Sequence, residues 1–202
     1  PLVKPASWPR RSMVHIWQIE FAGLLRPKRK IDAFEEKVTV SRRGLRRLLL
    51  ARVLRAYGLG DGPLLLAPGL GKPSLVAPRQ GRDISFSLSY SGGGAVIAIA
   101  PGGAVGVDIE RVGCLPDVRP VVDHFFSDEE QRDWQRVDPP HRQKAFYQCW
   151  TAKEALSKAT GEAMTTNFRQ LCVQLGGPSG ALLRRWVPPY TSARWSLRTF
   201  ET

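Results

Sequence analysis

The most restrictive feature of this sequence is an apolar run at residues 95–107 that is interrupted by Pro-Gly-Gly at residues 101–103. The uninterrupted part is too short to span a bilayer, and proline and glycine end regular structure. We therefore expect short strands at residues 95–100 and 104–109, with a junction between two parts of the chain. A chain of 202 residues, 43% of them hydrophobic, can bury the core of one domain or of two small ones.

Hydrophobic spacing predicts the other elements. Alternating residues predict strands at 13–21, at 84–88 and within 168–200, and a period near 3.6 predicts helices at 41–57 and 142–160. Ser41 is the expected N-cap of the first helix, and glycines directly follow both helices. The sequence therefore predicts a chain that contains both strands and helices.

The net charge of +12 is concentrated at one end of the chain. Residues 1–60 hold 14 basic and 4 acidic side chains, whereas residues 61–202 hold 16 and 14. Such a field attracts polyanions, which include nucleic acids, phosphorylated ligands and acidic proteins. A nucleic-acid-binding protein is therefore one hypothesis, although the sequence has no zinc finger, RNP pattern or evident helix-turn-helix.

The remaining composition narrows the class of protein. Aromatic residues make up 9% of the chain, and only three cysteines are present, so disordered chains and disulfide scaffolds are excluded. The cysteines are widely spaced, which suits a reducing cytosol, and we find no signal-peptide pattern. We therefore expect a cytoplasmic protein that is not inserted in a membrane.

Two carboxylates lie at the end of the second of the apolar strands, in the sequence GVDIE at residues 106–110. Residues two apart on a strand point to the same face, so Asp108 and Glu110 should project together. A cation between them would relieve their repulsion, and Mg²⁺ is the usual occupant of sites built from oxygen ligands. The alternative is a strand that runs into a solvated loop.

A second arrangement lies on the later helix. Trp150, Glu154 and Lys158 are four residues apart and share one helical face. Glu154 followed by Lys158 at this spacing is also the favoured orientation of a routine surface pair, which is the interpretation that these residues alone favour. The bulky Trp150 indicates that this face is at least partly buried.

A lysine among glycines is a third, weaker signal. Gly71, Lys72 and Pro73 could let backbone and ammonium groups approach a phosphate, but the proline breaks the P-loop pattern. A simple turn is the alternative.

The order of these motifs is more specific than any one of them. The chain resembles the Sfp-type 4′-phosphopantetheinyl transferases from about residue 14 to residue 175. The segments that carry the resemblance are GKP at 71–73, FSLSYSG at 86–92, GVDIE at 106–110, FFS at 125–127 with Glu130, and WTAKEALSKATG at 150–161.

The resemblance implies a fold and an activity. The fold would be α+β, with two similar α/β halves in a pseudo-twofold arrangement and coenzyme A in the cleft between them. The halves would be residues 12–101 and 102–202, after a flexible tail at 1–11. Such enzymes transfer the phosphopantetheine arm of coenzyme A to a serine of an apo acyl or peptidyl carrier protein, need Mg²⁺ and release adenosine 3′,5′-bisphosphate. They serve fatty-acid, polyketide or nonribosomal-peptide synthesis and are generally monomers.

By the same resemblance, catalytic and metal-binding positions can be assigned. Asp108, Glu110 and Glu154 would surround Mg²⁺ and the pyrophosphate. Glu154 would also act as the general base, and Lys158 would stabilise and protonate the departing phosphate. Trp150 would fix the helix by packing.

The residues that match the coenzyme A site of the family are spread along the chain. Arg26 and Arg29 could also contact the coenzyme A phosphates. At one position the family usually has His, whereas this chain has Tyr90, which can donate one hydrogen bond but carries no charge near neutral pH. The residues expected at this site are Arg42, Lys72, Pro73, Ser89, Tyr90, Asp108, Glu154 and Lys158.

Two questions stay open at this point. Glu130 matches an acidic position of the family, but it is also placed to complete a capping box with Ser127, which is the interpretation we favour. A non-catalytic relative that serves as an interaction module is a further hypothesis, against which the retention of all the acidic and basic motif residues argues.

Overall fold

The structure is a computed structural model whose described part falls into two compact units, each treated by itself below. The first unit comprises Pro1–Leu88 and Gly93–Val105, and the second comprises Ser89–Gly92 and Gly106–Thr202. Helices and strands occur in both units, so the α+β class is confirmed. The described residues are 14–20, 42–59, 84–113, 117–161, 168–177, 180–185 and 195–201.

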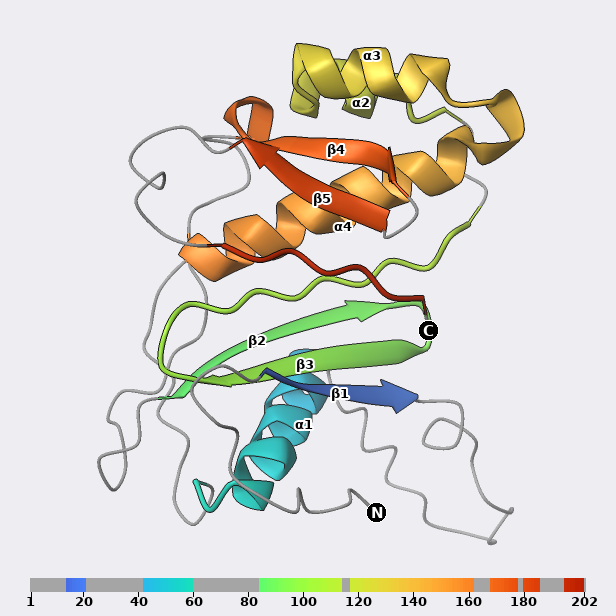
Figure 1. Cartoon of the computed structure of the whole chain (residues 1–202). Helices are drawn as coiled ribbons and strands as arrows, with labels where there is room; N and C mark the ends of the chain where they lie inside the picture. The colour runs from blue at the N-terminus through green and yellow to red at the C-terminus, as the bar shows by residue number, and fades with distance from the viewer. Residues whose placement is uncertain are drawn as a thin grey trace, which may run out of the picture. The chain divides into compact units, whose positions relative to one another are not determined.

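A three-stranded sheet is built from β1 (His15–Glu20), β2 (Ile84–Ser91) and β3 (Gly94–Pro101), in the order β1-β3-β2 (Figure 1). Strand β1 runs antiparallel to β3, with Trp17 opposite Ile97. The interior residues of β3 are all buried, which explains their continuous apolar run. The strands predicted at these positions are confirmed.

Helix α1 (Arg42–Ala56) belongs to the first unit, as β1 and β3 do, and confirms the first predicted helix. It ends before Gly58, whose φ of 73° lies in the left-handed region that glycine adopts without strain. The Tyr57 hydroxyl accepts a hydrogen bond of 2.8 Å from Nε1 of Trp17 and lies 2.8 Å from Nδ1 of His15. These contacts hold the end of α1 against β1. The expected N-cap residue lies outside the described residues.

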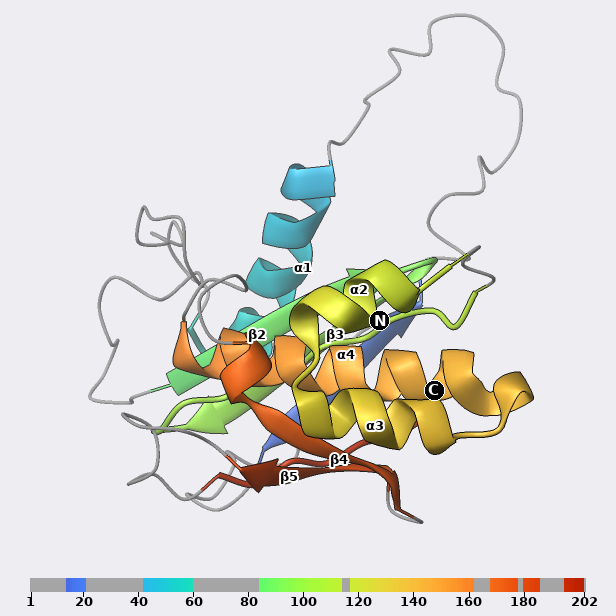
Figure 2. The same cartoon turned by 90° about the horizontal axis from the view of Figure 1, so that it is seen from above.

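The second unit contains the remaining helices and a two-stranded sheet (Figure 2). Helices α3 and α4 contact each other, and both contact β4, which pairs antiparallel with β5. No helix in the described ranges is both long and apolar enough to cross a membrane. The elements are α2 (Arg119–Phe125), α3 (Asp128–Arg136), α4 (Arg142–Thr160), β4 (Cys172–Gly177) and β5 (Gly180–Arg185), with 3₁₀ turns at Pro139–His141 and Phe168–Gln170.

The core of this unit lies between these helices and β4. Helix α4 has the predicted bounds and ends at Gly161, whose φ is 77°. Helix α3 begins with the predicted capping box, in which Ser127 and Glu130 exchange hydrogen bonds. The buried core residues are Val122, Phe126, Trp134, Ala145, Phe146, Cys149, Ala152, Leu156, Leu171, Val173 and Leu175.

Two predicted strands are wrong. Residues 104–109 are irregular instead: Asp108 and Glu110 bind serine side chains of β2, and Gly106 lies against the backbone of α4. Residues 195–200 are also irregular, although β4 and β5 confirm the start of the predicted C-terminal strands. Helix α2 was not predicted, since its seven residues include a proline and it has no side-chain N-cap.

Candidate active site

The candidate site is formed where the segment at residues 106–111 meets α4. Gly106 permits this approach, because a Cβ atom built on it would lie 1.8 Å from the carbonyl oxygen of Ala155. No side chain fits in that space, so glycine is required for the segment to run along the helix backbone. The carboxylates that follow Gly106 are thereby held beside the C-terminal half of α4.

Asp108 is at the centre of the contacts in this site. Its Oδ1 accepts hydrogen bonds from Oγ of Ser89 at 2.6 Å and from Nζ of Lys158 at 2.5 Å. Lys158 also donates to Oγ of Ser89 at 3.0 Å. The Asp108 side chain is only 4% exposed, whereas that of Lys158 is 30% exposed and therefore reaches solvent. Strand β2, the 106–111 segment and α4 each contribute one of these residues.

The second carboxylate oxygen of Asp108 has a different environment from the first. Oδ2 of Asp108 is buried and has no hydrogen-bond partner in the described part of the chain. A buried carboxylate oxygen without a donor is costly, so it marks a place where a ligand can bind.

Glu110, two residues after Asp108, also accepts a hydrogen bond from a serine of β2. Its Oε2 accepts a hydrogen bond of 2.6 Å from Oγ of Ser91, and the same Oγ accepts one of 2.8 Å from the backbone N–H of Arg111. Alternate serines of β2 thus bind alternate carboxylates. The expectation that both carboxylates project to one side therefore holds without a strand ladder. Glu110 is exposed, unlike Asp108.

Glu154 completes the acidic cluster from α4. Its side chain is buried, with 8% of the residue exposed. Its pKa is raised from 4.5 to about 7, mainly by burial and then by Asp108 and, to a lesser extent, by Glu110, while Lys158 opposes this shift. Glu154 can therefore exchange a proton near neutral pH, which a general base requires. A routine surface pair with Lys158 is excluded by this burial.

The acidic residues also allow a test of the predicted metal site. Within the described residues, no three His, Cys, Asp or Glu side chains are close enough together to form a complete ligand set. The donor set nevertheless suits a hard cation, because Asp108 has a buried oxygen without a partner and both other carboxylates contribute to one electrostatic cluster. In donor chemistry the described residues therefore suit Mg²⁺, although they are not assembled into a complete ligand set.

Only some of the other predicted site residues lie within the described part of the structure. Tyr90 lies on β2 between the two serines that bind the carboxylates. Arg42 is the first residue of α1, and its side chain is outside the described part of the structure. Lys72, Pro73, Arg26 and Arg29 also lie outside the described residues.

Aromatic packing surrounds the first half of α4. The Trp150 ring lies 5.6 Å from the rings of both Phe125 and Phe168 and 6.0 Å from that of Phe146. The prediction that Trp150 packs is confirmed, and that this packing fixes the helix stays a prediction.

One buried charge beside the site was missed at the sequence level. Lys153 is fully buried and forms an ion pair of 2.8 Å with Glu130, which is also the capping residue of α3. The signal was present, because Lys153 lies four residues after Cys149 and three before Leu156, within the buried stripe of α4.

With the geometry established, comparison with known proteins identifies the class. Residues 104–201, which contain most of the site, match the profile of the 4′-phosphopantetheinyl transferase superfamily. This stretch belongs to that superfamily. The resemblance drawn from the motif order is therefore confirmed, and the superfamily is one of enzymes.

Individual relatives agree with this assignment. The chain is 34% identical over 149 residues to 4′-phosphopantetheinyl transferase psf-1 of Bacillus pumilus, an alignment that covers 69% of this chain and 60% of the relative. It is 32% identical over 120 residues to 4′-phosphopantetheinyl transferase AcpT of Salmonella typhi, covering 58% and 61%. It is 31% identical over 127 residues to 4′-phosphopantetheinyl transferase HetI of a Nostoc species, covering 63% and 51%. The chain thus spans less than two thirds of the length of these relatives.

Proposed function

We propose that this chain transfers the 4′-phosphopantetheine arm of coenzyme A to a serine hydroxyl of an apo acyl or peptidyl carrier protein. Adenosine 3′,5′-bisphosphate is the second product. The observation that carries the proposal is the cluster of Asp108, Lys158 and the buried Glu154, which joins a carboxylate of raised pKa to a solvent-reaching ammonium.

The proton of the carrier serine goes to Glu154. With a pKa of about 7, its carboxylate is available near neutral pH and still basic enough to assist the attack. The serine oxygen then bonds to the phosphorus that carries the pantetheine arm. The bond between this phosphorus and the bridging oxygen breaks, and the electron pair leaves with the adenosine 3′,5′-bisphosphate.

Lys158 assists the leaving group in this step. Its Nζ is held by Asp108 and Ser89 in the free protein, and its side chain is open enough to turn to a phosphate oxygen. An ammonium at that oxygen stabilises the charge that develops there and can supply a proton. Because Glu154 and Lys158 are one helical turn apart, α4 presents the base and the acid to the same reaction centre.

The proposed cofactor is Mg²⁺, held by Asp108, Glu110 and Glu154. When bound, it would neutralise charge on the pyrophosphate oxygens. The partnerless Oδ2 of Asp108 supports its placement. For coenzyme A itself, we propose contacts from Ser89, Tyr90, Asp108, Glu154 and Lys158, together with Arg42, Lys72 and Pro73.

The finer predictions of fold and context are part of the same proposal. The chain would have pseudo-twofold halves at residues 12–101 and 102–202 after a tail at 1–11. Support comes from the presence of an antiparallel sheet and a long helix in each unit. We further propose a monomer that acts without nucleic acid or membrane in the cytoplasm, and the absence of a disulfide at Cys149 and Cys172 favours that reducing compartment.

The test is transfer from coenzyme A to a panel of purified apo carrier proteins from fatty-acid, polyketide and nonribosomal-peptide systems. The mass of each carrier reports the attached arm. Lys158→Ala should lower kcat by about 100-fold or more, by analogy with the loss of other groups that stabilise a transition state. Lys144→Ala is the matched control, because Lys144 lies on the same helix and, among the described residues, forms an ion pair with Glu201 at the surface.

Two results would contradict the proposal. One is the absence of transfer to every carrier in the panel under conditions in which a known transferase modifies them. The other is an equal kcat for the Lys158→Ala and Lys144→Ala variants.

A further inference from the structure

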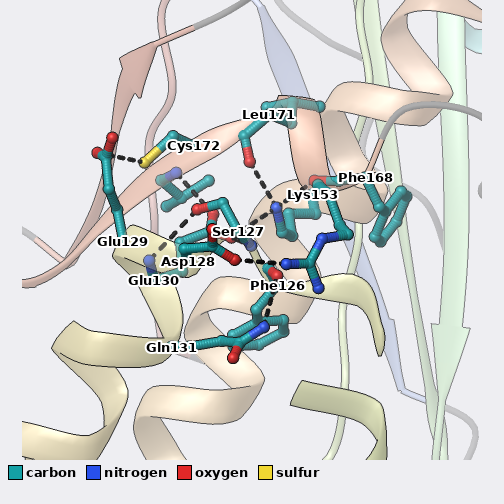
Figure 3. Close-up of polar contacts among 12 residues, drawn as sticks. Phe126, Ser127, Asp128, Glu129, Glu130, Gln131, Lys153, Phe168, Leu171 and Cys172 are labelled. Carbon is teal, nitrogen blue, oxygen red and sulfur yellow. Dashed lines mark hydrogen bonds and ion pairs between the residues drawn. The ribbon is translucent and has the colours of Figure 1, made fainter. Parts of the chain in front are cut away.

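A buried ionic network lies on the side of α4 that faces α3 and β4 (Figure 3). Nζ of Lys153 donates to the backbone carbonyl oxygens of Phe168 and Leu171, both at 2.5 Å. It also lies 2.8 Å from Oε2 of Glu130, and both charged side chains are 0% exposed. The ammonium therefore has three acceptors for its three N–H groups.

The glutamate in this network is equally well satisfied. Its Oε2 also accepts a hydrogen bond of 2.7 Å from the backbone N–H of Ser127, at the start of α3. Its Oε1 accepts one of 2.7 Å from the backbone N–H of Val173, in β4. Through Lys153 and Glu130, the N-terminus of α3, the segment after α4 and β4 are all bonded to one point on α4.

This point is next to the proposed catalytic residue. Successive residues of a helix differ by about 100° in direction, so Lys153 points into the α3–β4 side while Glu154 points toward Asp108. On the catalytic side, Gly106 lies in close contact with the backbone of Ala155. The rotation of α4 about its own axis is thus fixed from two sides within a single turn.

We propose that Lys153 and Glu130 are positioning residues, which set the rotation of α4 and thereby aim Glu154 and Lys158 at the reaction centre. This inference rests on the proposed catalytic roles of Glu154 and Lys158. Hydrophobic packing alone is non-directional, whereas the bonds from Lys153 run to fixed backbone carbonyls. A displacement of about 1 Å at a reacting group is enough to lower a rate about 100-fold.

A different result is expected if the Lys153–Glu130 ion pair only stabilises the fold. Breaking a buried ion pair on one side leaves an uncompensated charge, whereas replacing both partners with neutral residues of similar size is often tolerated. If the pair only stabilised the fold, the double replacement would restore both stability and activity. If it positions α4, the double replacement restores stability without restoring kcat.

The experiment compares wild type, Glu130→Gln and Lys153→Met/Glu130→Gln by thermal unfolding and by transfer kinetics, with coenzyme A varied and the best apo carrier of the panel in excess. Arg169→Met is the matched control, because Arg169 links the Phe168–Gln170 turn after α4 to Asp128 at the start of α3 through an ion pair whose side chains are 49% and 74% exposed. All rates are taken well below the unfolding temperature of each variant.

We expect kcat to fall at least tenfold in the folded variants, with the KM for coenzyme A within threefold of wild type and with no change in Arg169→Met. A smaller fall in kcat, or a loss that lies in KM, overturns the inference. Failure of both variants to fold also overturns it, because the network would then be a requirement for folding. If the wild type transfers nothing, or Glu154→Ala is fully active, it is the proposed function that fails.

Discussion

Replacing Glu154 with glutamine should make the metal-free protein more stable at alkaline pH. The pKa of Glu154 is about 7 in the folded state instead of 4.5, mainly because the carboxyl is buried and secondarily because Asp108 lies close by. The folded state therefore binds this proton more tightly than the unfolded state does, and ionised Glu154 opposes folding. Glutamine removes that opposition while keeping the size of the side chain.

The expected gain in the free energy of unfolding follows from the pKa shift of Glu154. One pKa unit is about 1.4 kcal/mol, so the shift from 4.5 to about 7 corresponds to roughly 3 kcal/mol at most. Solvent reaches the neighbouring Lys158, and its screening lowers this upper limit. We therefore expect Glu154→Gln to raise the free energy of unfolding by about 1 to 2 kcal/mol, or the unfolding temperature by about 2 to 8 °C. The gain should be absent at pH 4, grow between pH 4.5 and 7, and stay constant above pH 8.

The assay is thermal unfolding in chelator at several pH values, for wild type, Glu154→Gln and Glu20→Gln. The last variant removes the same charge from an exposed position on β1 and should have no such pH-dependent gain. The reasoning is refuted if Glu154→Gln is no more stable than wild type at pH 8, or if its gain is the same at pH 4.

Three further outcomes are expected. Gly106→Ala should lower the free energy of unfolding by about 3 kcal/mol or prevent folding, because its Cβ would lie 1.8 Å from the Ala155 carbonyl oxygen, whereas Gly113→Ala, with its nearest atom at 3.8 Å, should unfold like wild type. Tyr90→Phe should weaken coenzyme A binding about fivefold in calorimetry through the loss of one hydrogen bond, and an unchanged affinity would exclude that bond. Because the chain carries a net charge of +12, the KM for an acidic carrier protein should rise with salt while kcat changes little, and a salt-independent KM would show that the charge does not steer the carrier.

Local signals in the sequence were sufficient for much of the fold. Helix α4, its end at Gly161 and the capping box of α3 depend on neighbouring residues only, and all were predicted. The strand expected at residues 104–109 was wrong because its outcome depends on distant partners. Periodicity does not reveal that β2 would offer serine side chains to this segment.

The candidate site likewise combines features that the sequence predicts with contacts that only the folded chain reveals. The motif order was enough to single out Asp108 and Lys158, but the contact between them joins residues 50 positions apart and follows only from the folded chain. Lys153 was overlooked because lysine is ordinarily exposed. Its place in a buried stripe outweighs that tendency once Glu130 and two carbonyl oxygens are available to bind it.

The central claim is that Glu154 drives transfer of the phosphopantetheine arm, and one measurement tests it most directly. Wild type and Glu154→Ala are each mixed with coenzyme A, Mg²⁺ and an apo carrier, and the intact mass of the carrier is followed with time. We predict conversion to the phosphopantetheinylated carrier by wild type and a rate lower by about 100-fold or more for Glu154→Ala. Conversion by Glu154→Ala at the wild-type rate would contradict the claim.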